Sequence, residues 1–295
     1  MPTLKEIKGR IASVKSTLKI TSAMKLVSSA KLHKAQAAIE AMHLYQEQLQ
    51  RMLASVSGGT GTEIPESVPV DASKPRAIVA IASNSSLCGG FNAAAIAKVR
   101  SVRRAGDTVW SIGRKMADAM RRDGFPSPED FTALSEHPAY APAAVLVEKL
   151  SREVEEGRIG TVILVYNHFV STARQTPVEE TLLVASEGRD SVSSASLRDP
   201  VRANAPETES LPSDVIIEPG RKELLEALEP KVLKLKLYAA LLDSAAAEHA
   251  ARTVAMQTAT DNGNQLLDEL TLQYNKGRQQ KITNEILDLS GGRQD

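Results

Sequence analysis

The feature that most constrains this chain is a heptad pattern in its last third, roughly from Pro219 to Leu289. Apolar or small residues recur there at alternating steps of four and three, at Leu228, Val232, Leu235, Ala239, Leu242, Ala246, His249, Thr253 and Met256. This spacing is typical of a helix that winds around another helix. About 60 residues at about 1.5 Å each form a helix on the order of 90 Å long, too long to be buried in one small domain. The helix therefore needs a partner of similar length.

The N-terminal segment is the predicted partner, because Thr3 to about Ser57 contains no proline and only one glycine, Gly9. Two apolar runs step by three and four in different phases: Leu4, Ile7, Ile11, Val14 and Leu18, and then Met42, Tyr45, Leu49, Met52 and Val56. We therefore expect the heptad register to break between Ile20 and Ile39, where small residues replace large apolar ones. From periodicity alone, a helical hairpin that only holds its own shape explains both runs equally well.

The middle of the chain has the pattern of an α/β domain. It follows a Gly/Thr/Pro/Ser linker at 58–75. Strands are expected at 77–82, 108–112, 131–134 and 161–166, with an edge strand at 178–184, and helices at 93–104, 114–122 and 143–156. Strands that alternate with helices predict a mainly parallel sheet. The segment from Ser186 to Asp214 is rich in Ser, Asp, Glu, Pro and Arg and predicts a surface loop.

The predicted architecture is an antiparallel coiled coil that carries an inserted Rossmann-like α/β domain, a fold of the α+β or α/β class. The coiled coil comprises residues 1–58 and 216–295, and the inserted domain comprises residues 76–215. Aromatic residues make up only 3% of the chain, which is low for a large globular core and suits helical rods.

Charge and cysteine content restrict the functional classes. Lysine plus arginine equals aspartate plus glutamate at 36 each, so the whole-chain charge indicates no nucleic-acid partner. The N-terminal helix is nonetheless cationic, since the first 34 residues hold eight Lys or Arg against Glu6; this is either a solvated face or a rod inside an acidic or polar sleeve. The single cysteine, Cys88, excludes an intramolecular disulfide framework. No apolar run of about 18 residues occurs, so no membrane span is expected.

The turn after the first strand, Leu87 to Asn92 (LCGGFN), is the best candidate for enzyme chemistry. It lacks both the G-x-G-x-x-G and the G-x-x-x-x-G-K-[ST] spacing of phosphate-binding loops. The simpler interpretation is a tight turn in which Asn92 caps the following helix. Cys88 as a nucleophile would need a neighbouring base, which nothing in the sequence provides.

The histidines do not indicate a metal site. They are His33, His43, His137, His168 and His249, and no pair has metal-ligand spacing with another histidine or with Cys88. We expect no catalytic residues, no cofactor and no metal. His249, beside Glu248 and Arg252 on the heptad seam, is expected to make a polar contact that fixes the coiled-coil register.

Three stretches resemble the γ subunit of a bacterial F-type ATP synthase. They are LKEIKGRIASVKSTLKITSAMKLVSSAKL near the N-terminus, LCGGFN in the centre, and SAAAEHAARTVAMQTATDN with LTLQYNKGRQQKITNEI near the C-terminus. The resemblance implies a rotor shaft inside a ring of α and β subunits, with the α/β head beside the ε subunit on a membrane ring of c subunits. Proton flow would turn ring and shaft together, and the shaft would drive the catalytic β subunits through states of different nucleotide affinity. The chain would be peripheral, on the cytoplasmic face of the inner membrane.

The resemblance also implies site residues. Met24 and Lys25 match a pair near the lever segments of the β subunits. Arg278 and Gln279 match a hydrogen-bonding catch to β-subunit loops, and an arginine suits that role because its planar fork binds carboxylates bidentately. The remaining matches are Thr283 and Glu285, where the two helices are expected to pack together and contact the ring, while His249, Arg252 and Met256 are expected on the coiled-coil seam.

Two departures from the family pattern affect the expectations. Gly291-Gly292 is followed by Arg293-Gln294-Asp295, so the tip is more polar than in the family, and SNSS precedes LCGGFN where the family commonly has an Asp and a Gly. Two alternatives to a rotor shaft are a non-rotating coiled-coil scaffold, which would not need the polar NKGRQ and ITNE segments, and a nucleotide-binding α/β protein, which would need a complete phosphate loop.

Overall fold

The computed structural model describes residues 3–56, 74–184, 193–194 and 220–291. The chain forms two compact units. Residues 1–30 and 252–295 make the coil unit, and residues 31–251 make the head unit. Helices α1 (Leu4–Val56) and α6 (Arg221–Gly291) each contribute to both units. The expected pair of long terminal helices with an inserted α/β domain is therefore confirmed.

The head unit contains a five-stranded sheet in the order β2-β1-β3-β4-β5. The strands β1 (Arg76–Ile81), β2 (Thr108–Ile112) and β3 (Thr161–Phe169) are mutually parallel, whereas β4 (Gln175–Val184) runs antiparallel to β3 and β5 (Ser193–Ser194) runs antiparallel to β4. The sheet is therefore mixed rather than mainly parallel throughout. A short connection after β3 forms a hairpin with β4, and such a connection permits only antiparallel pairing.

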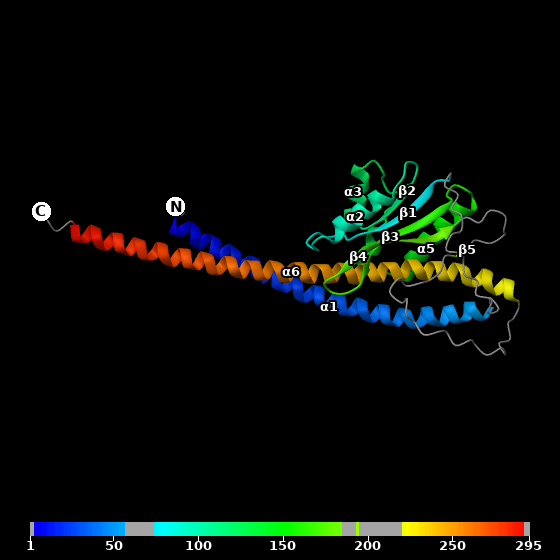
Figure 1. The fold of residues 1–295 in the computed structure, drawn as a ribbon, viewed down its shortest axis with the longest axis horizontal. Coiled ribbons are helices and arrows are strands. Elements are labelled where there is room, and N and C mark those ends of the chain that lie inside the picture. The colour runs from blue at the N-terminus through cyan, green and yellow to red at the C-terminus, as the bar shows by residue number, and fades with distance from the viewer. Residues whose placement is uncertain (1–2, 57–73, 185–192, 195–219, 292–295) are drawn as a thin grey trace. The chain divides into compact units, whose positions relative to one another are not determined.

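Helices cover both faces of this sheet (Figure 1). The helices α2 (Phe91–Val102) and α3 (Arg114–Arg122) pack on the face formed by Ile78, Ala80 and Val165. The helix α5 (Tyr140–Glu155) and part of α6 pack on the opposite face, formed by Ala77, Val79 and Leu164. Every residue of β1 is buried, which is why its sequence reads as a continuous apolar run instead of alternating.

Two local expectations are wrong. The segment expected to be a strand at 131–134 is instead the short helix α4 (Thr132–Glu136). It begins where the Asp130 carboxylate accepts a hydrogen bond from the Thr132 backbone N–H at 2.8 Å, a contact that favours a turn. The expected edge strand β4 is also longer than predicted and pairs with β5, which falls inside the segment expected to be a loop. The rest of that segment lies outside the described residues.

The expected register break in α1 is also wrong. The least exposed positions of α1 alternate in steps of three and four without an insertion. In the coil unit they are Leu4, Ile7, Ile11, Val14, Leu18, Thr21, Lys25 and Ser28, and in the head unit they are Leu32, Ala35, Ile39, Met42, Gln46, Leu49 and Leu53. Tyr45 and Met52, expected on the seam, are each 55% exposed. Apolar residues alone predicted the wrong seam because Thr21, Lys25 and Ser28 occupy seam positions. Met42 and Leu49 belong to both the predicted and the observed series of positions.

The positions expected to form the seam of α6 are mostly buried. The buried ones are Leu228, Val232, Leu235, Leu242, Ala246 and Met256. Ala239, His249 and Thr253 are half-buried. In the head unit, Leu228, Val232 and Leu235 pack with Met42 and Leu49 of α1, as a heptad seam requires.

Candidate functional site

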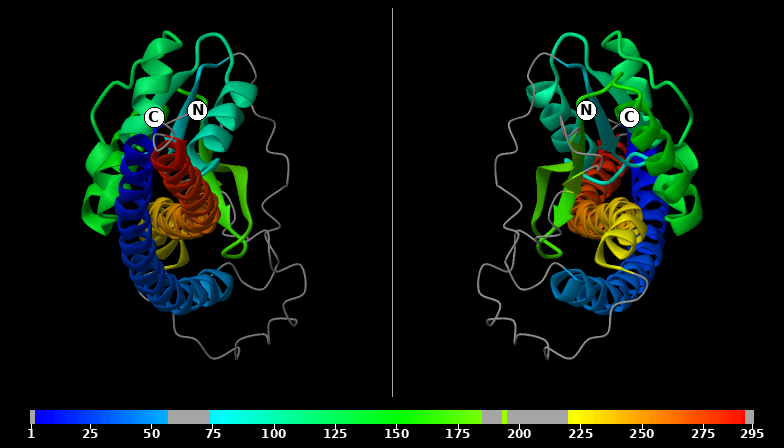
Figure 2. Two further views of the ribbon diagram at one scale, coloured as in Figure 1. Left: turned by 90° about the vertical axis from the view of Figure 1, so that its left-hand side faces the viewer. Right: turned by 90° about the vertical axis from the view of Figure 1, so that its right-hand side faces the viewer.

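The coil unit is an antiparallel pair of helical segments, drawn in blue and in orange to red in Figures 1 and 2. Leu4 faces Gly277 and Leu18 faces Gly263. Further along, the Thr21 and Thr260 hydroxyls lie 2.9 Å apart. Residue numbers on α1 therefore increase as the numbers of their partners on α6 decrease, which defines the antiparallel register.

Polar side chains join the helices in the middle of this register. The Lys25 ammonium donates a hydrogen bond to the Gln257 side-chain oxygen, and the Gln257 amide donates to Asp261 at 2.8 Å. Polar groups at seam positions cost stability compared with apolar ones but specify the register, because a shift would leave them unpaired. Lys25 therefore lies in the helix interface instead of extending away from it, and its neighbour Met24 is half-buried.

Gly277 faces Leu4, the first residue of α1, and α6 continues to Gly291. Every residue from 278 to 287 is exposed, so in the described part of the chain Thr283 and Glu285 do not pack against α1, contrary to expectation. This single-helix tip (278–291) carries four of the candidate contact residues, Arg278, Gln279, Thr283 and Glu285. The Thr283 hydroxyl donates a hydrogen bond to the Gln279 carbonyl of its own helix, 3.0 Å away, and Glu285 lies 3.6 Å from Lys281, one turn before it. The tip thus presents polar groups outward on a preformed helix.

The coil unit also exposes large apolar side chains, which the sequence argument overlooked. On the paired part, Leu26 is 70%, Val27 57% and Leu272 72% exposed. On the tip, Ile286 is 60% and Leu287 61% exposed. Leu26 and Val27, and likewise Ile286 and Leu287, are adjacent in sequence, so each pair exposes neighbouring apolar groups. Leu26 and Val27 lie between the seam positions 25 and 28, so apolar residues at outer heptad positions were the signal in the sequence.

The structure buries Arg252 and Met256 of the coil unit, at 8% and 5% exposed, and half-buries His249 of the head unit. Burial of Arg252 is unusual for a charged side chain. That these three residues form the coiled-coil seam stays a prediction. The expectation that His249 fixes the register stays a prediction.

The α1 segment of the coil unit is strongly cationic. Between Leu4 and Ala30 its charged residues are Lys5, Glu6, Lys8, Arg10, Lys15, Lys19 and Lys25, so six basic residues stand against one acid. Apart from Lys25, all of these are exposed. The outer surface of the coil unit therefore combines positive charge with exposed apolar side chains.

The LCGGFN turn in the head unit is built for packing. Cys88 is 1% exposed and packs with Phe91, Ala247 and Ala251, so the turn joins the sheet to α6. Asn92 does not cap α2, whose N-cap is Gly90. Its side-chain oxygen instead accepts hydrogen bonds from the Ser83 N–H at 3.0 Å and from the Ser83 hydroxyl at 2.9 Å. The Asn92 side chain, which was expected to cap the helix, therefore bridges the two ends of the turn.

The head is fixed to α6 by apolar and polar contacts. Leu233, Leu237 and Leu241 of α6 belong to the core of the sheet, and burial of a leucine contributes roughly 1.5–3 kcal/mol. The Asp243 carboxylate accepts a hydrogen bond from the Phe169 N–H at 3.0 Å and contacts the His168 Nδ1 at 2.5 Å. The Lys236 ammonium donates to the Thr181 carbonyl at 2.8 Å. Within the head unit, sheet and helix therefore form one body.

Among the described residues, no group of three or more His, Cys, Asp or Glu side chains is placed to hold a metal ion. No helix in the described part of the chain has both the length and the apolar character needed to cross a membrane.

Comparisons with known proteins agree with this geometry. The model of a family described as ATP synthase matches residues 3–294. The ATP synthase gamma chain of Phocaeicola vulgatus is 45% identical over 300 residues, which cover 99% of each chain. That of Flavobacterium johnsoniae is 38% identical over 297 residues, covering 99% of this chain and 98% of the relative. A chain in the rotor of the Euglena gracilis mitochondrial ATP synthase has the same fold, with a TM-score of 0.62 at 17% identity over 95% of this chain and 98% of that one.

Proposed function

This chain belongs to the family of ATP synthase γ chains, and we propose that it forms the central rotor shaft of an F-type ATP synthase. In this role it couples proton-driven rotation of a membrane c-ring to conformational changes in the catalytic β subunits, for ATP synthesis and, in reverse, for hydrolysis. Its partners are the α and β subunits around the shaft, the ε subunit and the c-ring. It is peripheral to the cytoplasmic face of the bacterial inner membrane. The chain provides no catalytic residues, cofactor or metal of its own.

The observation that carries this proposal is the outer surface of the coil unit. A free-standing coiled coil buries its apolar residues on the seam and exposes polar ones. This one also exposes Leu26, Val27, Leu272, Ile286 and Leu287. A ring of subunits that surrounds the shaft would remove these side chains from water. It would also explain why α6 continues beyond Gly277 with exposed side chains.

A rotor must also pass torque between its head and its shaft. The contacts of Lys236, Asp243 and the α6 leucines with the sheet give the head a rigid connection to the helix. When the head rotates, α6 would then rotate with it, because the head cannot slide along the helix. A shaft with no bond chemistry acts by biasing the conformational states of its partners.

We further propose that Met24, Lys25, Arg278, Gln279, Thr283 and Glu285 contact the α/β ring. The exposure of the four tip residues supports this assignment. Lys25 would act while bonded to Gln257, so it would contribute a positioned charge instead of a mobile one. The domain division at 1–58, 76–215 and 216–295 stays a prediction.

The test is direct observation of rotation in the assembled complex. Glu155 is exposed on α5, whereas the only native cysteine, Cys88, is 1% exposed, so an introduced Glu155→Cys provides a specific attachment point for a bead. With the α/β ring immobilised, we expect ATP to drive rotation of the bead. A bead that stays still while ATP is hydrolysed would favour the scaffold, and ATP hydrolysis by the isolated chain would favour the nucleotide-binding enzyme.

A further inference from the structure

The helical layer formed by α2 and α3 carries a positive charge that the chain as a whole lacks. Between Phe91 and Asp123 the basic residues are Lys98, Arg100, Arg103, Arg104, Arg114, Lys115, Arg121 and Arg122, and the acidic residues are Asp107, Asp118 and Asp123. Asp107 is buried against Arg76, with atoms 2.6 Å apart, so it does not offset the charge at the surface. The opposite face of the head has no such excess, because α5 carries three glutamates against two basic residues.

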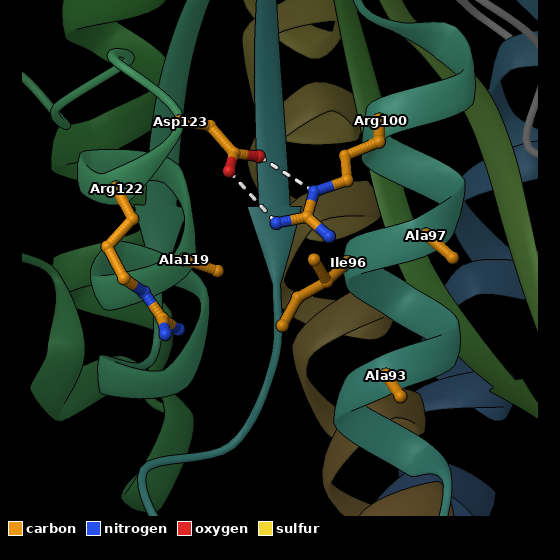
Figure 3. Close-up of a pocket in the computed structure, with 7 residues that line it drawn as sticks. All are labelled: Ala93, Ile96, Ala97, Arg100, Ala119, Arg122 and Asp123. Atoms are coloured by element: carbon orange, nitrogen blue, oxygen red, sulfur yellow. Dashed lines mark hydrogen bonds and ion pairs between the residues drawn. The ribbon is translucent and has the colours of Figure 1, made fainter.

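A hollow of about 510 Å³ lies between α2 and α3 (Figure 3). It is lined by small or apolar side chains, namely Ala93, Ile96, Ala97 and Ala119, and by charged side chains, namely Arg100, Arg122 and Asp123. Arg100 is held in place by a bidentate pair with Asp123, at 2.7 Å and 2.9 Å. The hydrogen bonds and charge of Arg100 lower the pKa of Asp123, so this carboxylate stays ionised.

A second, polar hollow of about 380 Å³ is lined by Lys98 and Ser101 of α2, by Arg104 just after its end, and by Glu179 of β4, which pairs with Lys98 at 2.6 Å. Arg103 contributes to it and stacks on the Phe125 ring, 3.9 Å from its centroid. Among the described residues, the buried Arg103 Nη1 has no hydrogen-bond partner, and the Asp123 oxygen is 4.0 Å away. The C-terminal half of α2 is therefore a basic ridge between two hollows.

We propose that this α2–α3 surface is a docking site for an acidic, amphipathic segment of another protein. Apolar side chains of the partner would enter the hollow above Ala97, and its carboxylates would pair with the guanidinium groups of Arg104 and Arg122. Arginine suits this pairing because its rigid fork matches carboxylate geometry. Within the head unit, the surface lies on the opposite face of the sheet from the α6 residues that pack on it, and the inference does not depend on the proposed shaft contacts.

The shape of the surface favours a protein partner over a lipid bilayer. Proteins that bind bilayers electrostatically combine basic residues with apolar side chains that protrude into the lipid. Here the apolar lining consists of three alanines and the half-buried Ile96, and no large apolar side chain of α2 or α3 is exposed among the described residues. The surface therefore has nothing to insert into lipid, whereas it can receive a side chain that projects from a partner.

The test measures binding of the full chain to a labelled helical peptide in which glutamates flank leucines at every fourth position. We expect Arg104→Glu combined with Arg122→Glu to weaken binding about tenfold or more, because like charges at an interface cost several kcal/mol. Both residues are exposed, and the Arg100–Asp123 pair is left intact, so the fold should persist. The matched control is Arg152→Glu with Lys231→Glu, an equal change of charge at exposed positions of α5 and α6, which should leave affinity unchanged.

Two further probes separate this site from general charge attraction. A peptide with glutamine in place of leucine should bind more weakly, since it lacks the side chains that fill the hollow. Equal loss of affinity in the control variant, or equal binding of the glutamine peptide, would overturn the proposal. Vesicles of phosphatidylglycerol and phosphatidylcholine provide the other comparison, and binding to them without binding to the peptide would assign the surface to lipid headgroups instead.

Discussion

Leu18 packs directly on Gly263 across the coil unit, and a Cβ atom at position 263 would lie 2.7 Å from the Leu18 Cδ2. Leu4 lies over Gly277 in the same way, where the corresponding distance is 3.1 Å. Glycine inside a helix costs roughly 1 kcal/mol relative to alanine. The close approach of the helices accounts for glycine at these two positions.

Enlarging residue 263 should therefore destabilise the coil unit. We expect Gly263→Leu to lower the stability of the helices by about 1–3 kcal/mol, the usual cost of overpacking. Thermal unfolding followed by far-UV circular dichroism measures the effect. Combining it with Leu18→Ala should recover part of the loss, since the smaller side chain makes room. Additive losses in the double variant would contradict the packing.

Removing the Asp243 carboxylate should loosen the head. Asp243→Ala deletes the acceptor for the Phe169 N–H and the partner of His168, and a buried donor left unpaired costs about 1–3 kcal/mol. Asp243→Asn keeps an acceptor oxygen and should lose less. Trp110, the only tryptophan, is 6% exposed in β2, so its fluorescence in urea reports unfolding of the head unit. Equal unfolding midpoints for both variants and the parent chain would exclude an anchoring role.

Lys236 should give the head a pH-dependent stability at alkaline pH. Its burial lowers the pKa of the ammonium below the usual 10.5, and the charge of Glu180 opposes this shift without cancelling it. Between the lowered pKa and 10.5 the unfolded chain binds more protons than the folded chain, so folding stability rises with pH.

The comparison for this prediction is Lys236→Met, which cannot titrate. We expect the stability of the parent chain relative to this variant to increase as pH rises toward 10.5 and to decrease as pH falls back through the lowered pKa. Urea midpoints from Trp110 fluorescence, measured at matched ionic strength, provide the numbers. A pH-independent difference between the two chains would show that Lys236 has the same pKa in both states.

Arg278→Ala combined with Gln279→Ala should weaken coupling or assembly of the complex without unfolding the isolated chain. Both side chains are exposed on the single-helix tip, and changes at such positions usually alter folding stability by less than about 0.5 kcal/mol. ATP synthesis and hydrolysis by reconstituted complexes measure the loss. The control is Asn264→Ala with Gln265→Ala, two exposed positions on the paired part of α6 outside the NKGRQ and ITNE segments. Unchanged coupling in the tip variant would remove these residues from the interface.

The sequence by itself determined the two long helices and the inserted domain. Heptad spacing is a local property, so the run from Leu228 to Met256 correctly indicated which side of α6 is covered. The continuous apolar runs at β1 and β3 likewise indicated strands covered on both faces. These features depend only on residues close together in the chain.

Only the tertiary structure decided the features that depend on distant residues. The seam of α1 runs through Thr21 and Lys25 because Thr260 and Gln257, more than two hundred residues later in the sequence, lie opposite them. The exposure of residues 278–287 is visible only in the structure, because the spacing of apolar residues does not encode that Leu4 faces Gly277. The side chain of Asn92 turns toward Ser83 instead of capping α2 because the turn brings the two together. Local sequence is compatible with several arrangements of these side chains. The one adopted is the one in which long-range packing leaves the fewest polar groups unpaired and the least space unfilled.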